Sequence, residues 1–248
     1  MKAMVLAAGL GTRLRPLTSD RPKALVELNG RTLLEITLSR LRTFGVSEVI
    51  INVHHFAAMI AEYLQANHNF GMRIEISRED VLLDTGGGLK KASHFFLENS
   101  SRLEEPFIVH NVDVLSTIDL LSMAEFHTEN QALATLAVQD RKTSRYLLFD
   151  GRQRLCGRQF GANQPELVRF CEPAQALGFS GIQIVSPRLL MMMTEDGAFS
   201  TITSYLRLAA GGEKILAFRA DQYYWRDIGK PESVAQAAED LKQNVIAP

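Results

Sequence analysis

Apolar and polar residues fall into blocks along the first 140 residues, and the spacing of the apolar positions changes from one block to the next. Short apolar runs, which are typical of buried parallel strands, alternate with stretches that repeat at helical spacing. Leu34, Leu38 and Leu41, for example, fall on one face of a helix predicted over 32–44. Gly45 follows and is suited to end that helix. Such alternation predicts a parallel sheet with crossover helices.

In this half we predict strands at 3–7, 48–52, 73–77, 106–110 and 132–138, and helices at 32–44, 57–64, 88–96 and 118–129. The pattern changes after about residue 140. An Asp-Gly pair at 150–151 lies between two short apolar runs, which predicts a β-hairpin. Further strands are predicted at 179–185 and 215–218, and helices at 199–208 and 231–243.

The composition is that of an ordinary globular chain. Hydrophobic residues make up 46%, charged residues 22%, and the net charge is -1. We therefore expect no nucleic-acid partner, and no apolar run is long enough for a membrane span. Two cysteines, Cys156 and Cys171, are too few for a disulfide scaffold, and we expect separate thiols in a cytoplasmic protein.

Candidate chemistry is concentrated in the loop that follows the first predicted strand. Gly9 and Gly11 allow backbone N–H groups to approach a ligand closely. A dinucleotide-binding fingerprint is excluded because Leu14 stands where its third glycine would be, and the Gly-Lys-Ser/Thr end of a P-loop is also absent. The loop therefore predicts a polyphosphate site of another kind. Its cations are Arg13, Arg15, Arg21 and Lys23.

This loop reads LAAGLGTRLRPLT over 6–18, with RPKAL at 21–25, and it resembles the first motif of the sugar-1-phosphate nucleotidyltransferases. These enzymes are also called NDP-sugar pyrophosphorylases. The chain is most similar to their N-acetylmuramate 1-phosphate uridylyltransferase and mannose-1-phosphate guanylyltransferase branches. The resemblance implies an α/β fold with a Rossmann-like, mostly parallel sheet, flanking helices and a small sugar-binding α+β subdomain. We expect one domain over 1–248, with a nucleotide-binding core at 1–140, a sugar-binding lid at about 141–224 and a closing segment at 225–248.

The resemblance also implies the reaction. A nucleoside monophosphate would pass from an NTP to a sugar 1-phosphate with Mg²⁺ as cofactor, giving an NDP-sugar and pyrophosphate. UTP with N-acetylmuramate 1-phosphate or a related sugar is the preferred pair, and GTP with mannose 1-phosphate or another pair is the alternative. We expect a monomer or homodimer without nucleic-acid or membrane partners.

Site residues carried over from the family fall in several segments of the chain. Arg13 and Lys23 would be catalytic. The three glycines of LLDTGGGLKK, at 82–91, are expected in a turn between a strand and a helix, where a flat base fits. The nucleotide-binding residues would be Leu6, Ala8, Gly9, Gly11, Thr12, Arg13, Thr85, Gly86 and Gly87.

Two carboxylates would hold the metal. Asp113 follows a predicted strand, at the sheet edge where α/β proteins bind ligands, and Asp227 lies in the family run WRDIGKPE. The sugar-binding residues would be Asn111, Glu172, Ser180 and Gly181.

The chain departs from the family pattern at two positions. Val112 replaces a usual glycine, and no lysine follows Glu172, so another cation takes its place or the chain belongs to a branch without it. Two other functions therefore stay open. A GT-A-type glycosyltransferase is one, because Asn111-x-Asp113 resembles an Asp-x-Asp motif, and an inactive nucleotide-binding paralogue is the other.

Overall fold

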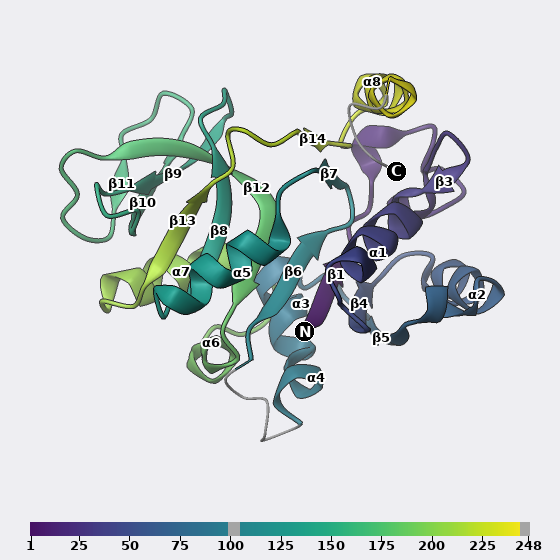
Figure 1. Cartoon of the computed structure of the whole chain (residues 1–248), viewed down its shortest axis with the longest axis horizontal. Helices are drawn as coiled ribbons and strands as arrows, with labels where there is room; N and C mark the ends of the chain where they lie inside the picture. The colour runs from purple at the N-terminus through teal and green to yellow at the C-terminus, as the bar shows by residue number, and fades with distance from the viewer. Residues whose placement is uncertain (99–104, 244–248) are drawn as a thin grey trace.

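The computed structural model describes residues 1–98 and 105–243, and one ten-stranded mixed sheet runs through this part of the chain (Figure 1). One side of the sheet is parallel, as predicted, and each of its strands hydrogen-bonds to the next. From the edge inward these strands are β5 (Arg73–Arg78), β4 (Glu48–Val53), β1 (Lys2–Leu6) and β6 (Phe107–Asn111).

The other side of the sheet is largely antiparallel. The long strand β12 (Gln175–Val185) pairs with β6 and with β8 (Ala134–Gln139), both antiparallel. The prediction that the strand at 132–138 continues the parallel series is wrong, because β12 lies between β8 and β6. The mixed α/β fold class is otherwise confirmed. The remaining strands are β9 (Arg145–Phe149), β10 (Leu155–Phe160), β11 (Glu166–Leu167) and β13 (Ile215–Arg219).

Helices cover both faces of the sheet and enclose two main apolar clusters. Both clusters receive side chains from alternate positions of the same strands: Val5 packs into one and Met4 into the other. The first face carries α1 (Leu33–Thr43), α2 (Ala57–Ala66) and α5 (Leu120–Glu129). The second carries α3 (Asp84–Lys91), α4 (Ser93–Leu97), α6 (Arg188–Met192) and α7 (Thr201–Ala210).

A third, smaller cluster anchors the last helix, α8 (Pro231–Lys242), beside the first loop. Two short ladders lie here, β2 (Glu27–Leu28) with β3 (Arg31–Thr32) and β7 (Val114–Ser116) with β14 (Trp225–Asp227). Three 3₁₀ turns complete the described part: η1 (Thr12–Leu14), η2 (Lys23–Leu25) and η3 (His68–Gly71). The proposed division at 140 and 224 stays a prediction, because the one sheet takes strands from both of the first two parts.

Local sequence explains the end points of α1. The Thr32 hydroxyl caps the first turn by accepting a hydrogen bond from the Glu35 N–H at 3.0 Å. At the other end Gly45 has a φ of 77°, in the left-handed region that favours glycine. The prediction for this helix is confirmed to within one residue at each end.

The glycine-rich segment at 86–88 differs from the prediction. We expected a turn before a helix starting at residue 88, but α3 already begins at Asp84 and contains all three glycines. Close packing is the reason. A methyl group on Gly86 would lie 2.4 Å from the Phe199 ring, and one on Gly87 would lie 2.3 Å from the Gly197 carbonyl oxygen. Glycine therefore lets α3 approach the 197–199 segment.

The expectation of two separate thiols is wrong. Cys156 on β10 and Cys171 form a disulfide. The β9–β10 hairpin, predicted around Asp-Gly, turns the chain so that β11 pairs with β10 and the following segment passes Cys156. This closure depends on strand register, which cysteine counting does not address.

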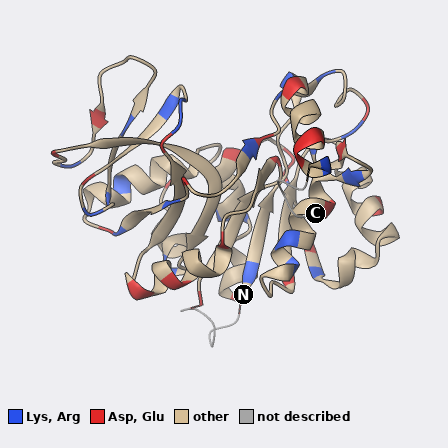
Figure 2. Ribbon diagram, turned by 45° about the horizontal axis from the view of Figure 1, so that its top comes forward, with Lys and Arg blue, Asp and Glu red and all other residues tan. Residues whose placement is uncertain are grey.

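Residues of both charge signs occur on each side of the fold. Figure 2 shows basic and acidic residues on both the parallel and the antiparallel side of the sheet, in line with the net charge of -1. None of the described helices combines the length and apolar character that crossing a membrane requires.

Candidate active site

The first loop leaves the end of β1 and is held in shape by Gly11. This glycine has a φ of 64°, and its carbonyl oxygen accepts a hydrogen bond from the Thr18 hydroxyl at 2.8 Å. A methyl group at this position would lie 3.1 Å from Thr18, so both the backbone angle and the space favour glycine. Gly9, in contrast, has no atom within 4 Å of such a methyl group, which leaves its backbone open to a ligand.

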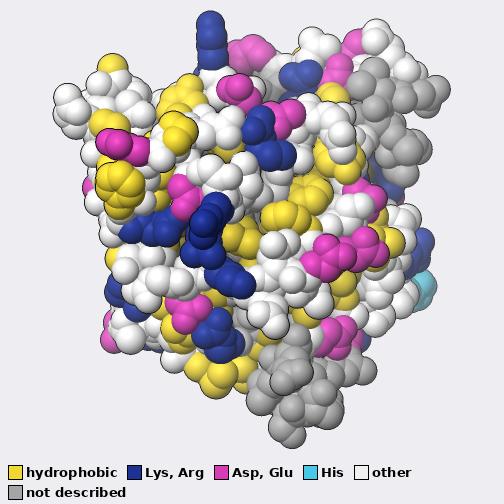
Figure 3. Space-filling view, turned by 60° about the vertical axis from the view of Figure 1, so that its left-hand side comes forward, with side chains coloured by type: hydrophobic (Ala, Val, Ile, Leu, Met, Phe, Trp, Pro, Cys, Tyr) yellow, Lys and Arg dark blue, Asp and Glu magenta, His cyan; other side chains and the backbone are white. Residues whose placement is uncertain are grey.

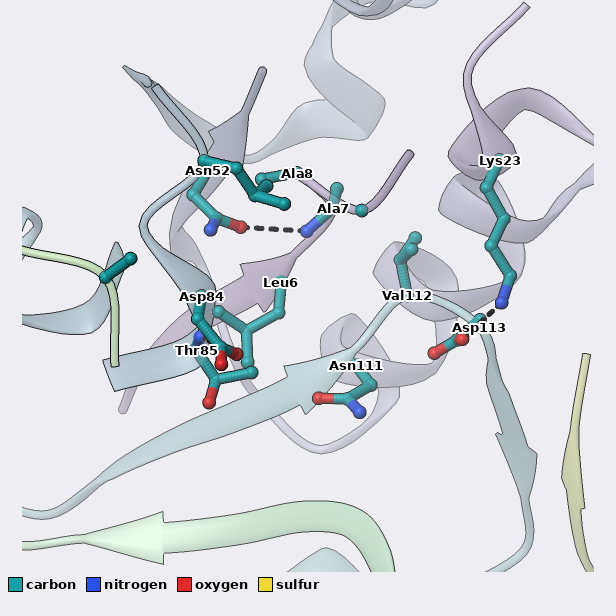
Figure 4. Close-up of a pocket in the computed structure, with 13 residues that line it drawn as sticks. Leu6, Ala7, Ala8, Lys23, Asn52, Asp84, Thr85, Asn111, Val112 and Asp113 are labelled. Atoms are coloured by element: carbon teal, nitrogen blue, oxygen red, sulfur yellow. Dashed lines mark hydrogen bonds and ion pairs between the residues drawn. The ribbon is translucent and has the colours of Figure 1, made fainter. Parts of the chain in front are cut away.

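Three adjoining cavities open at the carboxyl ends of the parallel strands. Cavity A, of about 360 Å³, and cavity B, of about 280 Å³, share Gly9, Lys23, Leu82 and Asp113. Figure 4 shows cavity A, with Asn52 hydrogen-bonded to the Ala7 backbone on one side and Lys23 beside Asp113 on the other. Of the predicted nucleotide-binding residues, the following line A or B: Leu6, Ala8, Gly9, Gly11, Thr12, Arg13 and Thr85.

Cavity C, of about 560 Å³, extends from the same centre across the antiparallel side of the sheet. It shares Leu6, Thr85 and Asn111 with cavity A, and Asp227 lies on its wall. The three cavities thus form a continuous depression with the predicted metal residues between them.

The two predicted metal carboxylates are brought together by the β7–β14 ladder. Asp227 is paired in register with Val114, and the Ile228 N–H donates to the Asp113 carbonyl oxygen at 2.8 Å. Oδ1 of Asp227 is buried without a hydrogen-bond partner. Burial and the nearby Asp113 charge raise the pKa of Asp227, while Lys23, Arg13 and Arg141 oppose the increase.

Two of the four first-loop cations point into this centre. Lys23, with 11% of its side chain exposed, forms an ion pair with Asp113. Arg13 Nη2 lies 3.3 Å from the position of a methyl group on Gly229, and Asp227 Oδ1 lies 2.5 Å from the same position. Arg21 instead pairs with Asp20 on the surface at 3.0 Å.

This donor set fits Mg²⁺. The described part of the chain contains no cluster of three or more His, Cys, Asp or Glu side chains that would enclose a metal ion. Mg²⁺, however, commonly takes one or two carboxylates and fills its other positions with water and substrate phosphates. The unpartnered Oδ1 of Asp227 beside Asp113 is the kind of buried anionic oxygen that such an ion satisfies.

Val112 does not strain the site. Its φ is not in the left-handed region, its N–H donates to the Leu6 carbonyl oxygen at 3.1 Å, and its side chain packs in the first core cluster. A β-branched residue therefore fits where glycine was expected.

Two of the predicted nucleotide-binding residues lie outside the three cavities. Gly86 and Gly87 are buried in α3, and both of their N–H groups donate to the Phe199 carbonyl oxygen, at 2.8 and 3.2 Å. They line none of the three cavities, whereas Leu82, Asp84 and Thr85 of the same motif line cavity A. A base contact by these two glycines stays a prediction. Thr85 also stabilises the start of α7, because its Oγ1 accepts a hydrogen bond from the Thr201 N–H at 3.0 Å.

On the predicted sugar side, Asn111 lines cavities A and C. Gly181 packs directly against the Asn111 side chain. Its φ is 74°, and a methyl group there would lie 2.9 Å from Asn111 Nδ2, so glycine is required for this contact. Ser180 is buried and presents its carbonyl oxygen to Trp225 Nε1 at 2.7 Å, while Glu172 is exposed. Neither Ser180 nor Glu172 lines any of the three cavities.

Cavity C is also lined by residues that carry no sequence signal, among them Arg141 and Gln183. Arg141 stacks over the Trp225 ring at 3.9 Å and donates to the Phe179 carbonyl oxygen at 2.7 Å. It follows the end of β8, and only the pairing of β8 with β12 brings it to Asp227. Figure 3 shows basic side chains gathered on the face formed by this end of the molecule, with hydrophobic side chains between them.

Known proteins resemble this chain in sequence. A family model described as "Nucleotidyl transferase" matches residues 2–150. The chain is 34% identical over 97% of both lengths to an N-acetylmuramate alpha-1-phosphate uridylyltransferase of Caulobacter vibrioides. It is 29% identical to a mannose-1-phosphate guanyltransferase of Yarrowia lipolytica, over 94% of this chain and 61% of that one.

Solved structures show the same fold. HddC from Yersinia pseudotuberculosis, complexed with GMP-PN, superposes with a TM-score of 0.76 at 24% identity, covering 97% of this chain and 99% of that chain. A UDP-glucose pyrophosphorylase complexed with UDP-glucose superposes with a TM-score of 0.78 at 18% identity, and the superposition covers 98% of both chains.

Proposed function

This chain belongs to the sugar-1-phosphate nucleotidyltransferase family, and from that membership we propose that its substrates are UTP and N-acetylmuramate 1-phosphate or a closely related sugar 1-phosphate. The observation that carries this choice is the match to the Caulobacter uridylyltransferase over 97% of both chains. The match to the Yarrowia guanyltransferase leaves more than a third of that protein unaccounted for, since it covers 61% of it. GTP with mannose 1-phosphate is therefore the second candidate.

The site supports an in-line displacement. An oxygen of the sugar phosphate forms a bond to the α-phosphorus of the NTP, and the bond from that phosphorus to the bridging oxygen breaks, releasing pyrophosphate. No general base is needed, because a phosphate dianion is already nucleophilic. The task of the protein is positioning and charge neutralisation.

Each charged residue has a place in that scheme. The first loop and cavities A and B would take the nucleotide, with Arg13 on the departing pyrophosphate and Lys23 at the reacting phosphates. Arg141 would meet the sugar phosphate in cavity C and replace the missing lysine after Glu172. Asp113 and Asp227 would hold Mg²⁺, which when bound neutralises phosphate charge.

A coupled pyrophosphate assay with the four NTPs and a panel of sugar 1-phosphates tests the proposal. UTP with N-acetylmuramate 1-phosphate should give the highest kcat/KM. Greater activity with GTP and mannose 1-phosphate would favour the second candidate. A glycosyltransferase would release no pyrophosphate here but would release NDP from an NDP-sugar donor and an acceptor, and release of neither product would identify an inactive paralogue.

A further inference from the structure

An amide side chain in the floor of cavity C has one half of its hydrogen-bonding capacity unused. Gln183 lies in β12 and is only 2% exposed, yet it lines this cavity. Its Oε1 accepts a hydrogen bond from the Tyr205 hydroxyl at 2.8 Å. The described residues provide no acceptor for Nε2, and this atom is not among their fully buried unpaired atoms. The amide nitrogen is therefore the part of Gln183 that meets the cavity.

Tyr205 fixes the orientation of this amide. It lies in α7, is completely buried and packs in the second core cluster. Burial raises the pKa of its hydroxyl, which stays protonated and able to donate. Gln183 is the hydrogen-bond partner that the described residues give this hydroxyl. Because an unpaired hydroxyl in an apolar core is costly, the contact holds the amide oxygen toward the core and leaves the nitrogen outward.

The strand register places this nitrogen near the predicted sugar side. Gln183 is paired with Val109 on β6, and residues two apart on a strand share a face. Asn111, two residues after Val109 on β6, therefore lies on the same face as Gln183, and both line cavity C. Ile202, one helical turn before Tyr205, adds an apolar wall to cavity C.

We propose that Gln183 is a sugar-specificity residue, whose Nε2 donates a hydrogen bond to an acceptor oxygen on the sugar, and that Tyr205 is its positioning residue. The acceptor is a carbonyl oxygen of an acylamino group or a ring hydroxyl. The proposal rests on cavity C taking the sugar, as in the proposed function. A pre-oriented buried donor selects for sugars with an acceptor at that place, since a sugar without one leaves the donor unpaired.

The test compares wild type with Gln183→Leu and Tyr205→Phe in the full-length protein. Calorimetry measures binding of N-acetylglucosamine, glucosamine and glucose 1-phosphates, and the pyrophosphate assay measures KM for both substrates. Gln183→Leu should weaken sugar phosphate binding roughly 2- to 13-fold, the value of one neutral hydrogen bond. Tyr205→Phe, which keeps the ring, should produce a smaller loss in the same direction.

The matched control is Tyr63→Phe. Tyr63 also hydrogen-bonds through its hydroxyl, to Glu35 and Thr32, but it lies on α2 outside the cavities. This variant should bind sugar phosphates as wild type does. In the two test variants KM for the NTP and kcat should stay near the wild-type values, whereas a general structural defect would change all three constants.

The sugar panel identifies the acceptor. An effect confined to the N-acetylated sugar indicates the acyl carbonyl, and an equal effect on all three indicates a hydroxyl. Wild-type affinity in both test variants would overturn the inference, as would no binding of any sugar phosphate by wild type. Should Gln183→Leu fail to fold, Tyr205→Phe decides alone. Absence of pyrophosphate release with Gln183-dependent binding would refute the proposed function and leave this inference standing.

Discussion

Replacing Asp227 with Asn is expected to stabilise the protein while it reduces activity. In the folded chain this carboxylate is partly buried, lies beside Asp113 and has an unpartnered oxygen, so its charged form is disfavoured. Asn has nearly the same shape without the charge. The substitution therefore removes an electrostatic cost at neutral pH together with a predicted metal ligand.

The sizes follow from these two effects. A single stabilising substitution commonly contributes about 0.5–2 kcal/mol, which in a chain of this size raises Tm by roughly 1–8 °C. Loss of a metal ligand should lower kcat/KM by at least about 100-fold, since even partners of ligands contribute 10- to 100-fold.

Asp113→Asn is the matched comparison. Asp113 is ion-paired to Lys23, whose side chain is 11% exposed, so removal of this charge weakens a partly buried ion pair. A hydrogen bond to a charged group contributes about 1.5–3 kcal/mol, so this variant should be destabilised although its activity is also lost. Two Asp-to-Asn changes in one site should thus shift Tm in opposite directions.

The pH dependence of stability tests independently whether the Asp227 charge destabilises the folded protein. The folded-state pKa of Asp227 is raised above its ordinary 3.8, so wild type loses stability relative to the Asn variant as pH rises through that raised value. Below pH 3.8 the two should converge. Thermal unfolding from pH 3 to 8 and the pyrophosphate assay measure both effects. A destabilised Asp227→Asn, or a gain that does not grow with pH, would refute the electrostatic argument.

Three further predictions concern the same centre. Arg13→Ala should raise the barrier by on the order of 2.7–4 kcal/mol, about 10²- to 10³-fold in turnover, and near-normal kcat would exclude its role at the leaving group. Gly229→Ala places a methyl group 2.5 Å from Asp227 Oδ1 and should lower kcat by about 100-fold, whereas Gly151→Ala, with nothing within 4 Å, should leave it unchanged; equal kcat in both would contradict the geometry. Arg141→Ala should raise KM for the sugar phosphate about 10- to 100-fold with little change for the NTP, and an effect on the NTP alone would place Arg141 elsewhere.

The parallel half of the fold could be predicted because each element carries its own signal. The α1 helix has a threonine cap, a leucine stripe and a terminal glycine, and all three are local. The first loop could also be predicted from the sequence, since its glycines and cations lie within fifteen residues of one another. Six predicted nucleotide-binding residues of this loop line cavities A and B for that reason.

The rest depended on contacts that no local pattern contains. The sequence pattern at Gly86 and Gly87 is typical of a turn. The structure shows that these glycines instead allow close packing against the 197–199 segment. Arg141 and Gln183 carry no motif, and both reach cavity C only through the pairing of β12 with its neighbours. Cys156 and Cys171 meet because β11 folds back on β10.

The β7–β14 ladder sets the order in which the site is completed during synthesis. It pairs Asp227 with Val114, which lies 113 residues earlier in the chain. The parallel strands and the pair of Lys23 with Asp113 come from the first half, which leaves the ribosome first. A nascent chain that has folded only its first half therefore holds one carboxylate of the pair, and the candidate site is completed by β14, the last of the described strands.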